Sequence, residues 1–398
     1  MKLFVFSLEL QRSCFYKVGG LKNIKNVGKN IVKKFRKKLA IATGTIAITL
    51  LPLQALAKDY SALNIFGDSL LDAGNLFNLT GLPPSPPYDQ KLSNGPVWVE
   101  QLAVELDLEP VLVTEAIPNL LRGKVPTEGI NFALTGSLSS DVNVVSPLLP
   151  GLQQQIETFG GLATFIPPKS DALFVLLAGG NDYNEAIFRP SSIDSAALPN
   201  QVTDNLTNAV AALIGSGAKQ LLVSNLPNLG QQPFADFLDQ VNPQSSALLT
   251  SFSTQHNLLL DQKLTALEAA SGAHITQLDL DSLFASAISN PGEFGFTNVD
   301  DTCLTNFQPG FMFEGVCTNP DEFLFWDNVH PTTQAHGLIA QLALETLHKQ
   351  EPGEGAQSVP EPSGIVGLLA LGGGAILRRR GFAITAYRSR SKSRNQAM

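Results

Sequence analysis

Charged residues are scarce in this chain, and basic ones are almost confined to its ends. Only 16% of the 398 residues are charged. Residues 1–57 hold eleven Lys/Arg and one acid, and residues 363–398 hold seven and none. The two ends together contain 18 of the 27 basic residues and one of the 35 acidic residues. Residues 58–362 therefore hold nine basic and 34 acidic residues, a net charge of −25. A body so poor in Lys and Arg repels phosphate backbones, so no nucleic-acid partner is expected.

Other absences narrow the class of protein. There is no Gly-X-Y repeat, which excludes a collagen, and the hydrophobic fraction of 44% is too high for a disordered chain. No apolar run reaches the roughly 20 residues that span a bilayer. A length of 398 residues allows one large domain or two ordinary ones.

The N-terminus has the pattern of an export signal. A basic stretch at 33–38 precedes an apolar run at 39–53, and Ala55-Leu56-Ala57 follows, the small-x-small pattern that a signal peptidase cleaves. A single transmembrane anchor is the alternative, but the run is short for one. We therefore expect residues 1–57 to be a leader, with signal peptidase as a partner and an exported mature chain.

The C-terminus has the pattern of a second sorting signal. Val-Pro-Glu-Pro at 359–362 leads into an apolar stretch at 364–377 and three arginines at 378–380. This order resembles the PEP-CTERM sorting signal of exported bacterial proteins; an ordinary tail anchor is the alternative. The resemblance implies a membrane sorting enzyme as a partner, transient membrane contact, and a final place in the cell envelope, on the cell surface or outside the cell. A linker at 351–362 and a sorting segment at 363–398 would then lie outside the fold.

Residues 58–350 show the alternation of strands and helices typical of an α/β domain. Short apolar runs bounded by turn residues predict buried parallel strands at 63–66, 130–133, 173–178, 220–223 and 275–278. Helices are expected at 97–106, 152–159, 202–214, 245–270 and 333–347. Such alternation favours a parallel sheet with helices on both faces, and it places the functional loops at the carboxyl ends of the strands.

The first motif whose residues could take part in a reaction follows the first expected strand. Residues 66–70 read Phe-Gly-Asp-Ser-Leu, which holds the hydroxyl of Ser69 at a tight turn facing the crevice. Its backbone N–H there could stabilise charge on an acyl carbonyl oxygen. Alternatively, Asp68 or Ser69 caps the next helix.

Two further motifs contain polar side chains that could take part in the same reaction. Residues 177–183 read Leu-Ala-Gly-Gly-Asn-Asp-Tyr, where the Asn181 carboxamide could donate to an oxyanion or could simply suit a turn. In 325–332, Phe-Trp-Asp-Asn-Val-His-Pro-Thr, Asp327 stands three residues before His330. A carboxylate at that spacing can orient an imidazole and stabilise its cation.

Together these motifs resemble those of the GDSL, or SGNH, hydrolases. Gly-Asp-Ser-Leu, Asn-Phe-Ala-Leu-Thr-Gly at 131–136, Gly-Gly-Asn-Asp and Asp-x-x-His-Pro-Thr occur in that order, and the likeness covers about 60–347. The resemblance implies a flavodoxin-like three-layer α/β/α sandwich with a parallel sheet. It also implies that Ser69 is the nucleophile, that His330 is the base and Asp327 orients it, and that the backbone N–H groups of Ser69 and Gly136 and the Asn181 side chain form an oxyanion hole. Neither a metal nor a cofactor is implied.

The expected function is therefore an exported serine esterase or lipase that hydrolyses acyl esters, small or lipidic, through an acyl-enzyme. A polysaccharide O-acetyl esterase or an acyltransferase is the nearest alternative. A non-catalytic envelope or matrix protein on the same fold is the alternative from another class. Retention of Ser69, Asp327 and His330 favours an enzyme, because an inert scaffold has no physical reason to keep all three.

Two cysteines remain beyond the leader, Cys303 and Cys317. In an exported chain a single close pair is expected to form a disulfide, and no histidine lies between them to suggest a metal site. The phenylalanines around them, at 294, 296, 307, 311 and 313, could line an acyl site or pack beneath the disulfide.

Overall fold

A computed structural model describes residues 60–188, 194–307 and 311–349 of the chain. The expected leader at 1–57, the Pro-Glu-Pro linker at 351–362 and the sorting segment at 363–398 all lie outside these described residues. Within the described part, no helix is both long enough and apolar enough to cross a membrane.

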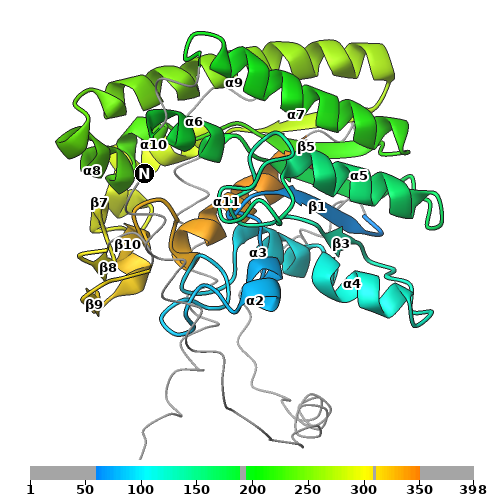
Figure 1. The fold of residues 1–398 in the computed structure, drawn as a ribbon, viewed down its shortest axis with the longest axis horizontal. Coiled ribbons are helices and arrows are strands. Elements are labelled where there is room, and N and C mark those ends of the chain that lie inside the picture. Colours follow the sequence, from blue (N-terminus) through cyan, green and yellow to red (C-terminus); the bar gives the residue numbers. More distant parts are fainter. Residues whose placement is uncertain (1–59, 189–193, 308–310, 350–398) are drawn as a thin grey trace, which may run out of the picture. The chain divides into compact units, whose positions relative to one another are not determined.

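The centre of the fold is a six-stranded sheet in the order β2-β3-β1-β4-β5-β6 (Figure 1). All its pairings are parallel. The strands are β1 (Leu63–Gly67), β2 (Val111–Leu112), β3 (Ile130–Asn131), β4 (Leu173–Leu177), β5 (Gln220–Ser224) and β6 (His274–Leu278). Every residue of β1 and β4 is buried, as expected for strands covered on both faces.

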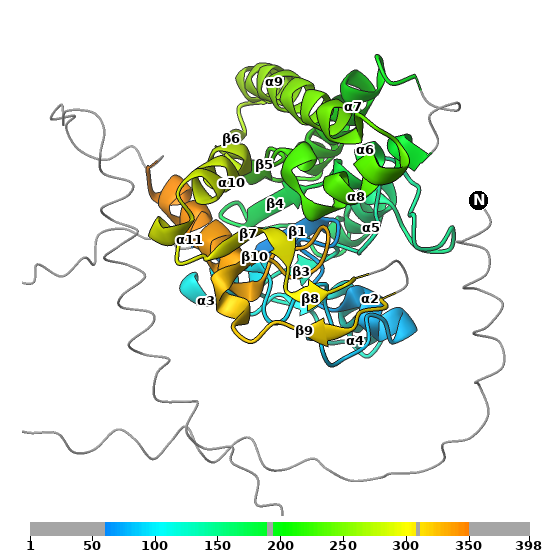
Figure 2. The ribbon, with the colours of Figure 1, turned by 90° about the vertical axis from the view of Figure 1, so that its left-hand side faces the viewer.

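Helices cover both faces of the sheet, which makes three layers (Figures 1 and 2). One face carries α5 (Leu152–Ala163), α6 (Gly180–Phe188), α7 (Leu198–Gly215), α8 (Pro233–Val241) and α9 (Ser245–Ser271). The other carries α3 (Trp98–Glu105), α10 (Leu280–Ser289) and α11 (Thr333–Lys349). Two short helices, α2 (Asn75–Thr80) and α4 (Val113–Leu120), lie near the β2 edge.

The alternation of side chains along β1 divides the hydrophobic core in two. Phe66 packs with Phe132, Phe159 and Phe174 on the α5–α7 side, with ring centroids 5.0 to 6.5 Å from its own. Leu63 and Ile65 point to the α3–α11 side. The fold is thus the expected α/β/α sandwich with a parallel sheet.

All five expected strands and all five expected helices are present, with ends displaced by a few residues. The two-residue strand β2 and the helices α2, α4, α6, α8 and α10 were not anticipated. Their apolar segments are short, so the helical period covers two or three turns and does not stand out from the surrounding loops.

In the sequence between α10 and α11, the chain forms four short strands. Here β7 (Asn298–Thr302) pairs in parallel with β10 (Phe323–Phe325), and β8 (Leu304–Thr305) forms a hairpin with β9 (Gly315–Val316). A disulfide joins Cys303 to Cys317, with their Cα atoms 4.8 Å apart. Its neighbours are aromatic rings, including Tyr88 and Trp326.

Candidate active site

The first piece of the site is the sharp turn that presents Ser69 after β1. Gly67 has a φ of 145°, and a Cβ there would lie 1.9 Å from the carbonyl oxygen of Leu177 on the neighbouring strand, so only glycine fits. The Gln155 side chain receives the Gly67 N–H at 2.9 Å and donates to its carbonyl oxygen at 2.8 Å. The backbone before Ser69 is therefore held from both sides.

Ser69, His330 and Asp327 form one hydrogen-bonded chain although 261 residues separate the first two. The Oγ of Ser69 lies 2.9 Å from Nε2 of His330, and Nδ1 of His330 lies 2.8 Å from Oδ1 of Asp327. The Asp327 carboxylate is almost fully buried, whereas His330 keeps 13% of its side chain exposed. The structure thus brings together the three residues that the sequence singled out.

The Asp327 carboxylate is fixed by more than His330. Its Oδ1 also accepts the backbone N–H groups of Val329 and His330, and its Oδ2 accepts the Tyr88 hydroxyl at 2.8 Å. Burial alone would raise the pKa of Asp327, but the His330 charge and these hydrogen bonds outweigh burial and hold it below its usual value. The Asp327 carboxyl therefore favours its charged form in the folded protein.

Tyr88 is a site residue that sequence reasoning missed. It is 2% exposed, and burial together with the Asp327 charge raises its pKa far above the usual value, so the phenol is the donor in this bond. Tyr88 stands 239 residues before Asp327 within a proline-rich segment, and no local pattern connects the two.

The two other expected oxyanion donors lie side by side at the ends of β3 and β4. One N–H of the Asn181 carboxamide donates to the Ser137 carbonyl oxygen at 3.0 Å, which fixes the amide beside Gly136. Among the described residues, the backbone N–H groups of Ser69 and Gly136 have no hydrogen-bond acceptor. These two groups and the second N–H of the Asn181 amide are the candidate donors to an oxyanion.

A buried polar network holds the Ser69 turn against the Gly136 turn. The Asp72 carboxylate accepts the N–H of Asn75 at 2.6 Å, and the N–H and Oγ1 of Thr135 at 2.9 Å each. Asn131 donates to the Leu71 carbonyl oxygen at 2.8 Å. Because Thr135 directly precedes Gly136, the network sets the distance between two of the expected oxyanion donors.

Ser137 replaces the alanine that is common after this glycine in the family that the motifs resemble. It is fully buried, its Oγ donates to the carbonyl oxygens of Leu134 and Pro150, and it accepts from Gln155. The substitution therefore adds a link between the Gly136 turn and the residue that holds Gly67.

Two more buried carboxyls belong to residues next to Ser69 and Asn181 in the sequence. Burial raises the pKa of Asp68 to about 7, and the nearby His330 charge only partly offsets this. Burial likewise raises the pKa of Asp182 to about 6, against the two hydrogen bonds it accepts from Ser139. Asp182 fixes the segment that follows Gly136.

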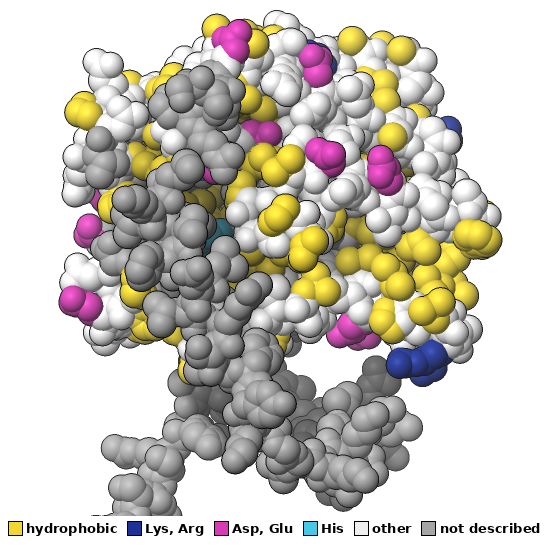
Figure 3. Space-filling model, in the orientation of Figure 1, with side chains coloured by type: hydrophobic (Ala, Val, Ile, Leu, Met, Phe, Trp, Pro, Cys, Tyr) yellow, Lys and Arg dark blue, Asp and Glu magenta, His cyan; other side chains and the backbone are white. Residues whose placement is uncertain are grey.

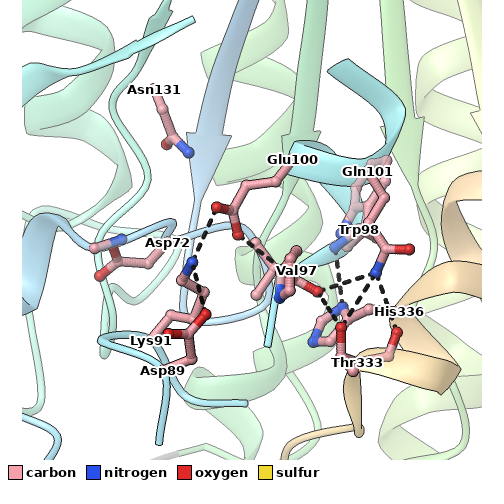
Figure 4. Close-up of polar contacts among 12 residues, drawn as sticks. Asp72, Asp89, Lys91, Val97, Trp98, Glu100, Gln101, Asn131, Thr333 and His336 are labelled. Carbon is pink, nitrogen blue, oxygen red and sulfur yellow. Dashed lines mark hydrogen bonds and ion pairs between the residues drawn. The ribbon is translucent and has the colours of Figure 1, made fainter. Parts of the chain in front are cut away.

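The segment after His330 is anchored on α3 (Figure 4). The Gln101 amide donates to the Thr333 carbonyl oxygen at 3.1 Å, and the Trp98 N–H donates to Nδ1 of His336 at 3.2 Å. Burial lowers the pKa of His336 to about 3, so its ring stays neutral and can accept that bond. These contacts fix the start of α11, three residues beyond the His330 imidazole.

The phenylalanines near the disulfide divide between two clusters. Phe294 and Phe296 are buried in the core on the α3–α11 side. Phe307, Phe311 and Phe313 pack on the Tyr88 and Cys303 cluster. Among the described residues, no group of three or more His, Cys, Asp or Glu side chains is placed to hold a metal ion.

Comparison with known proteins gives a consistent family match. Residues 63–343 match the family described as GDSL-like Lipase/Acylhydrolase. The chain is 26% identical to a phosphatidylcholine-sterol acyltransferase of Aeromonas hydrophila, over 73% of this chain and 91% of that protein. It is also 26% identical to a GDSL esterase/lipase of Arabidopsis thaliana, over 71% of this chain and 88% of the relative.

Solved structures of similar proteins are more distant. A hydrolase from the metagenome of Lake Arreo aligns with a TM-score of 0.40 and 15% identity, over 72% of this chain and 95% of that one. An acetylxylan esterase of Geobacillus stearothermophilus aligns with a TM-score of 0.38 and 13% identity, over 72% and 94% of the two chains.

Proposed function

Since the chain belongs to the GDSL-like lipase and acylhydrolase family and is a hydrolase of ester bonds, we propose that it cleaves acyl esters through a covalent intermediate on Ser69. The observation that carries this proposal is the chain of hydrogen bonds from Ser69 through His330 to Asp327, with distances of 2.9 and 2.8 Å. A nucleophile, a base and a group that orients the base are the parts that acyl transfer to a hydroxyl requires.

The proposed reaction proceeds in two halves. His330 Nε2 takes the proton of Ser69 as Oγ attacks the ester carbonyl carbon, and the Asp327 carboxylate stabilises the resulting imidazolium. The N–H groups of Ser69 and Gly136 and the Asn181 carboxamide stabilise the tetrahedral oxyanion. His330 then returns the proton to the departing alcohol, which leaves an acyl group on Ser69. His330 takes a proton from water as the water oxygen attacks the acyl carbon. The bond from that carbon to Oγ breaks, His330 returns the proton to Oγ, and the carboxylic acid leaves.

A non-catalytic envelope or matrix protein is the weaker proposal. An unused site would not require a buried carboxylate with four hydrogen bonds from three residues, and burying such an anion costs free energy unless it is paired. The maintained site therefore favours the enzyme.

We also propose that the enzyme acts outside the cytoplasm, after signal peptidase cleavage behind Ala57 and processing by a membrane sorting enzyme. The support is the order of basic, apolar and small residues in the sequence at 33–57 and the Pro-Glu-Pro pattern at 359–362. A disulfide between Cys303 and Cys317 is consistent with an oxidising compartment.

The decisive experiment is to trap the intermediate. A fluorophosphonate probe should label Ser69 in the full chain, and mass spectrometry of the digested protein should locate the adduct there. Ser69→Ala should lose labelling and hydrolysis of p-nitrophenyl acetate while its thermal unfolding stays cooperative. An adduct on another serine, or undiminished hydrolysis by Ser69→Ala, would disprove the assignment.

A further inference from the structure

The loop that leads from the Gly136 turn to α5 exposes an unusual number of apolar side chains. We call residues 139–150 the valine loop. Its exposed apolar residues are Val142 (51% exposed), Val144 (39%), Val145 (44%) and Leu148 (92%). Single exposed apolar residues are ordinary, but several together next to a site indicate a contact surface.

Hydrogen bonds hold the valine loop in this shape. Asn143 is buried, and its amide donates to the carbonyl oxygens of Thr135 at 3.0 Å and Pro150 at 3.1 Å, which ties the loop to the residue before Gly136 and to its own last residue. Its Oδ1 accepts the Val145 N–H at 2.9 Å. The loop thus buries its polar asparagine and exposes its valines to water. Exposed apolar surface is unfavourable in water, which favours a functional reason for the exposure of these valines.

Apolar side chains adjoin two segments that carry expected site residues. A Cβ on Gly136 would lie 2.6 Å from Cγ2 of Val145, so this valine directly flanks an expected oxyanion donor. Phe188, at the end of α6, is 55% exposed, with its ring 5.9 Å from that of Phe234. The Phe234 N–H donates to the carbonyl oxygen of Asn328, the residue after Asp327.

The charges among these side chains are all of one sign. The described segments 139–150, 180–188 and 233–241 contain no Lys or Arg, whereas Asp141 and Asp236 are exposed among them. In the face drawn in Figure 3, Lys and Arg lie only towards the edges, while acidic and hydrophobic side chains are spread between them. Such a surface repels anionic headgroups and complements one whose outermost charge is a quaternary ammonium.

We propose that the valine loop and Phe188 dock the enzyme onto a zwitterionic lipid surface of the phosphatidylcholine type. The apolar side chains enter the headgroup region, the acids face the choline groups, and an acyl ester is presented to Ser69. The inference builds on the proposed function, because it names the lipid form in which the substrate of that same site is presented.

A fluorescence measurement tests docking without turnover. Leu148→Trp, in the full chain carrying Ser69→Ala, should show a blue shift in emission with phosphatidylcholine vesicles. The native Trp98 and Trp326 are buried at 0% and 2% exposure, so they add a constant background. The matched control is Phe165→Trp, since Phe165 is 85% exposed beyond the end of α5 and its tryptophan should not shift.

Three results would overturn docking: an unshifted tryptophan at 148, an equal shift at 148 and 165, or a shift that follows protein concentration without vesicles, which would indicate a second copy of the chain. In active enzyme, Leu148→Ser should lower vesicle hydrolysis about tenfold more than p-nitrophenyl acetate hydrolysis, because burying one leucine contributes about one tenfold step in binding. Phe165→Ser should lower neither relative to the other.

The two hypotheses fail separately. If Ser69 is trapped by the probe but the emission of Leu148→Trp does not shift, docking is wrong and the proposed function stands. If the emission of Leu148→Trp shifts but the probe labels another residue, the proposed function is wrong and the surface remains a lipid-docking surface.

Discussion

The Tyr88 side chain, far from Asp327 in the sequence, helps to orient the Asp327 carboxylate. Its hydroxyl donates to Oδ2 of Asp327, while the backbone groups of Val329 and His330 occupy Oδ1. Hydrogen bonds from two directions leave the carboxylate little freedom to rotate away from His330.

Tyr88→Phe should therefore lower kcat by roughly tenfold, with a smaller effect on KM, because a hydrogen bond to a charged group contributes about 1.5–3 kcal/mol. Losing a donor also raises the pKa of Asp327, so the loss of activity on acidification should begin at a higher pH than in the wild type. Steady-state kinetics across pH check both. Tyr183→Phe is the matched control, because it removes a buried hydroxyl that contacts His256 instead; an equal loss in both variants would refute the role of Tyr88.

Asn181 offers a second prediction at the same scale. If its carboxamide is one of three oxyanion donors, Asn181→Ala should slow turnover by roughly 10²–10³-fold. The bond from Asn181 to the Ser137 carbonyl oxygen is also lost, so circular dichroism and thermal unfolding must accompany the kinetics. A rate near that of the wild type would remove Asn181 from the oxyanion hole.

At the scale of the elements, the hairpin of β8 and β9 connects the Cys303–Cys317 disulfide to the segment that carries Asp327 and His330. The N–H of Cys303 donates to the Phe325 carbonyl oxygen at 3.0 Å, and that of Leu304 donates to Trp326 at 2.9 Å. Cys303 itself is fully buried. The disulfide is thus attached by backbone hydrogen bonds to the two residues that precede Asp327.

Cys303→Ser should destabilise the protein by about 3 kcal/mol, the value for closing a loop of this size. Activity should fall at a lower temperature than the one at which the whole protein unfolds, since the segment carrying Asp327 loosens first. Paired activity and calorimetry scans measure this difference. Two titratable thiols in the native oxidised wild-type protein would show that the bond is absent and that the tether does not operate.

At the scale of the whole molecule, buried titratable groups make stability depend on pH. Burial lowers the pKa of His336 to about 3, from an unperturbed value near 6.5. The unfolded chain therefore binds a proton below pH 6.5 that the folded chain refuses, and the stability contribution of the neutral ring is lost as pH falls from 6.5 towards 3. Buried Asp68 and Asp182, with raised pKa values, act in the opposite direction.

His336→Gln isolates the histidine contribution. Relative to the wild type, its free energy of unfolding should rise by about 1.4 kcal/mol for each pH unit below 6.5, and the difference should be constant above it. Urea unfolding at pH 7.5, 5.5 and 4.5 is sufficient. His348→Gln, at an exposed position, is the control. A difference that does not change with pH would mean that His336 is not held neutral by the fold.

The sequence by itself determined the fold class and the chemistry of the central residues. Strands such as 173–178 are recognisable because full burial on both faces demands an unbroken apolar run. Ser69, Asp327 and His330 are recognisable because each stands in a local motif at a strand or helix boundary. Local patterning is enough wherever a residue's role depends on its immediate neighbours.

Only the tertiary structure decided which distant groups meet. Tyr88 binds Asp327 across 239 residues, and Gln155 binds Gly67 across 88. A hydroxyl or an amide carries no local sign of its partner, because its hydrogen bond depends on where packing of the whole sheet places it. The same holds for the phenylalanines near the disulfide, whose burial or exposure is settled by what covers them.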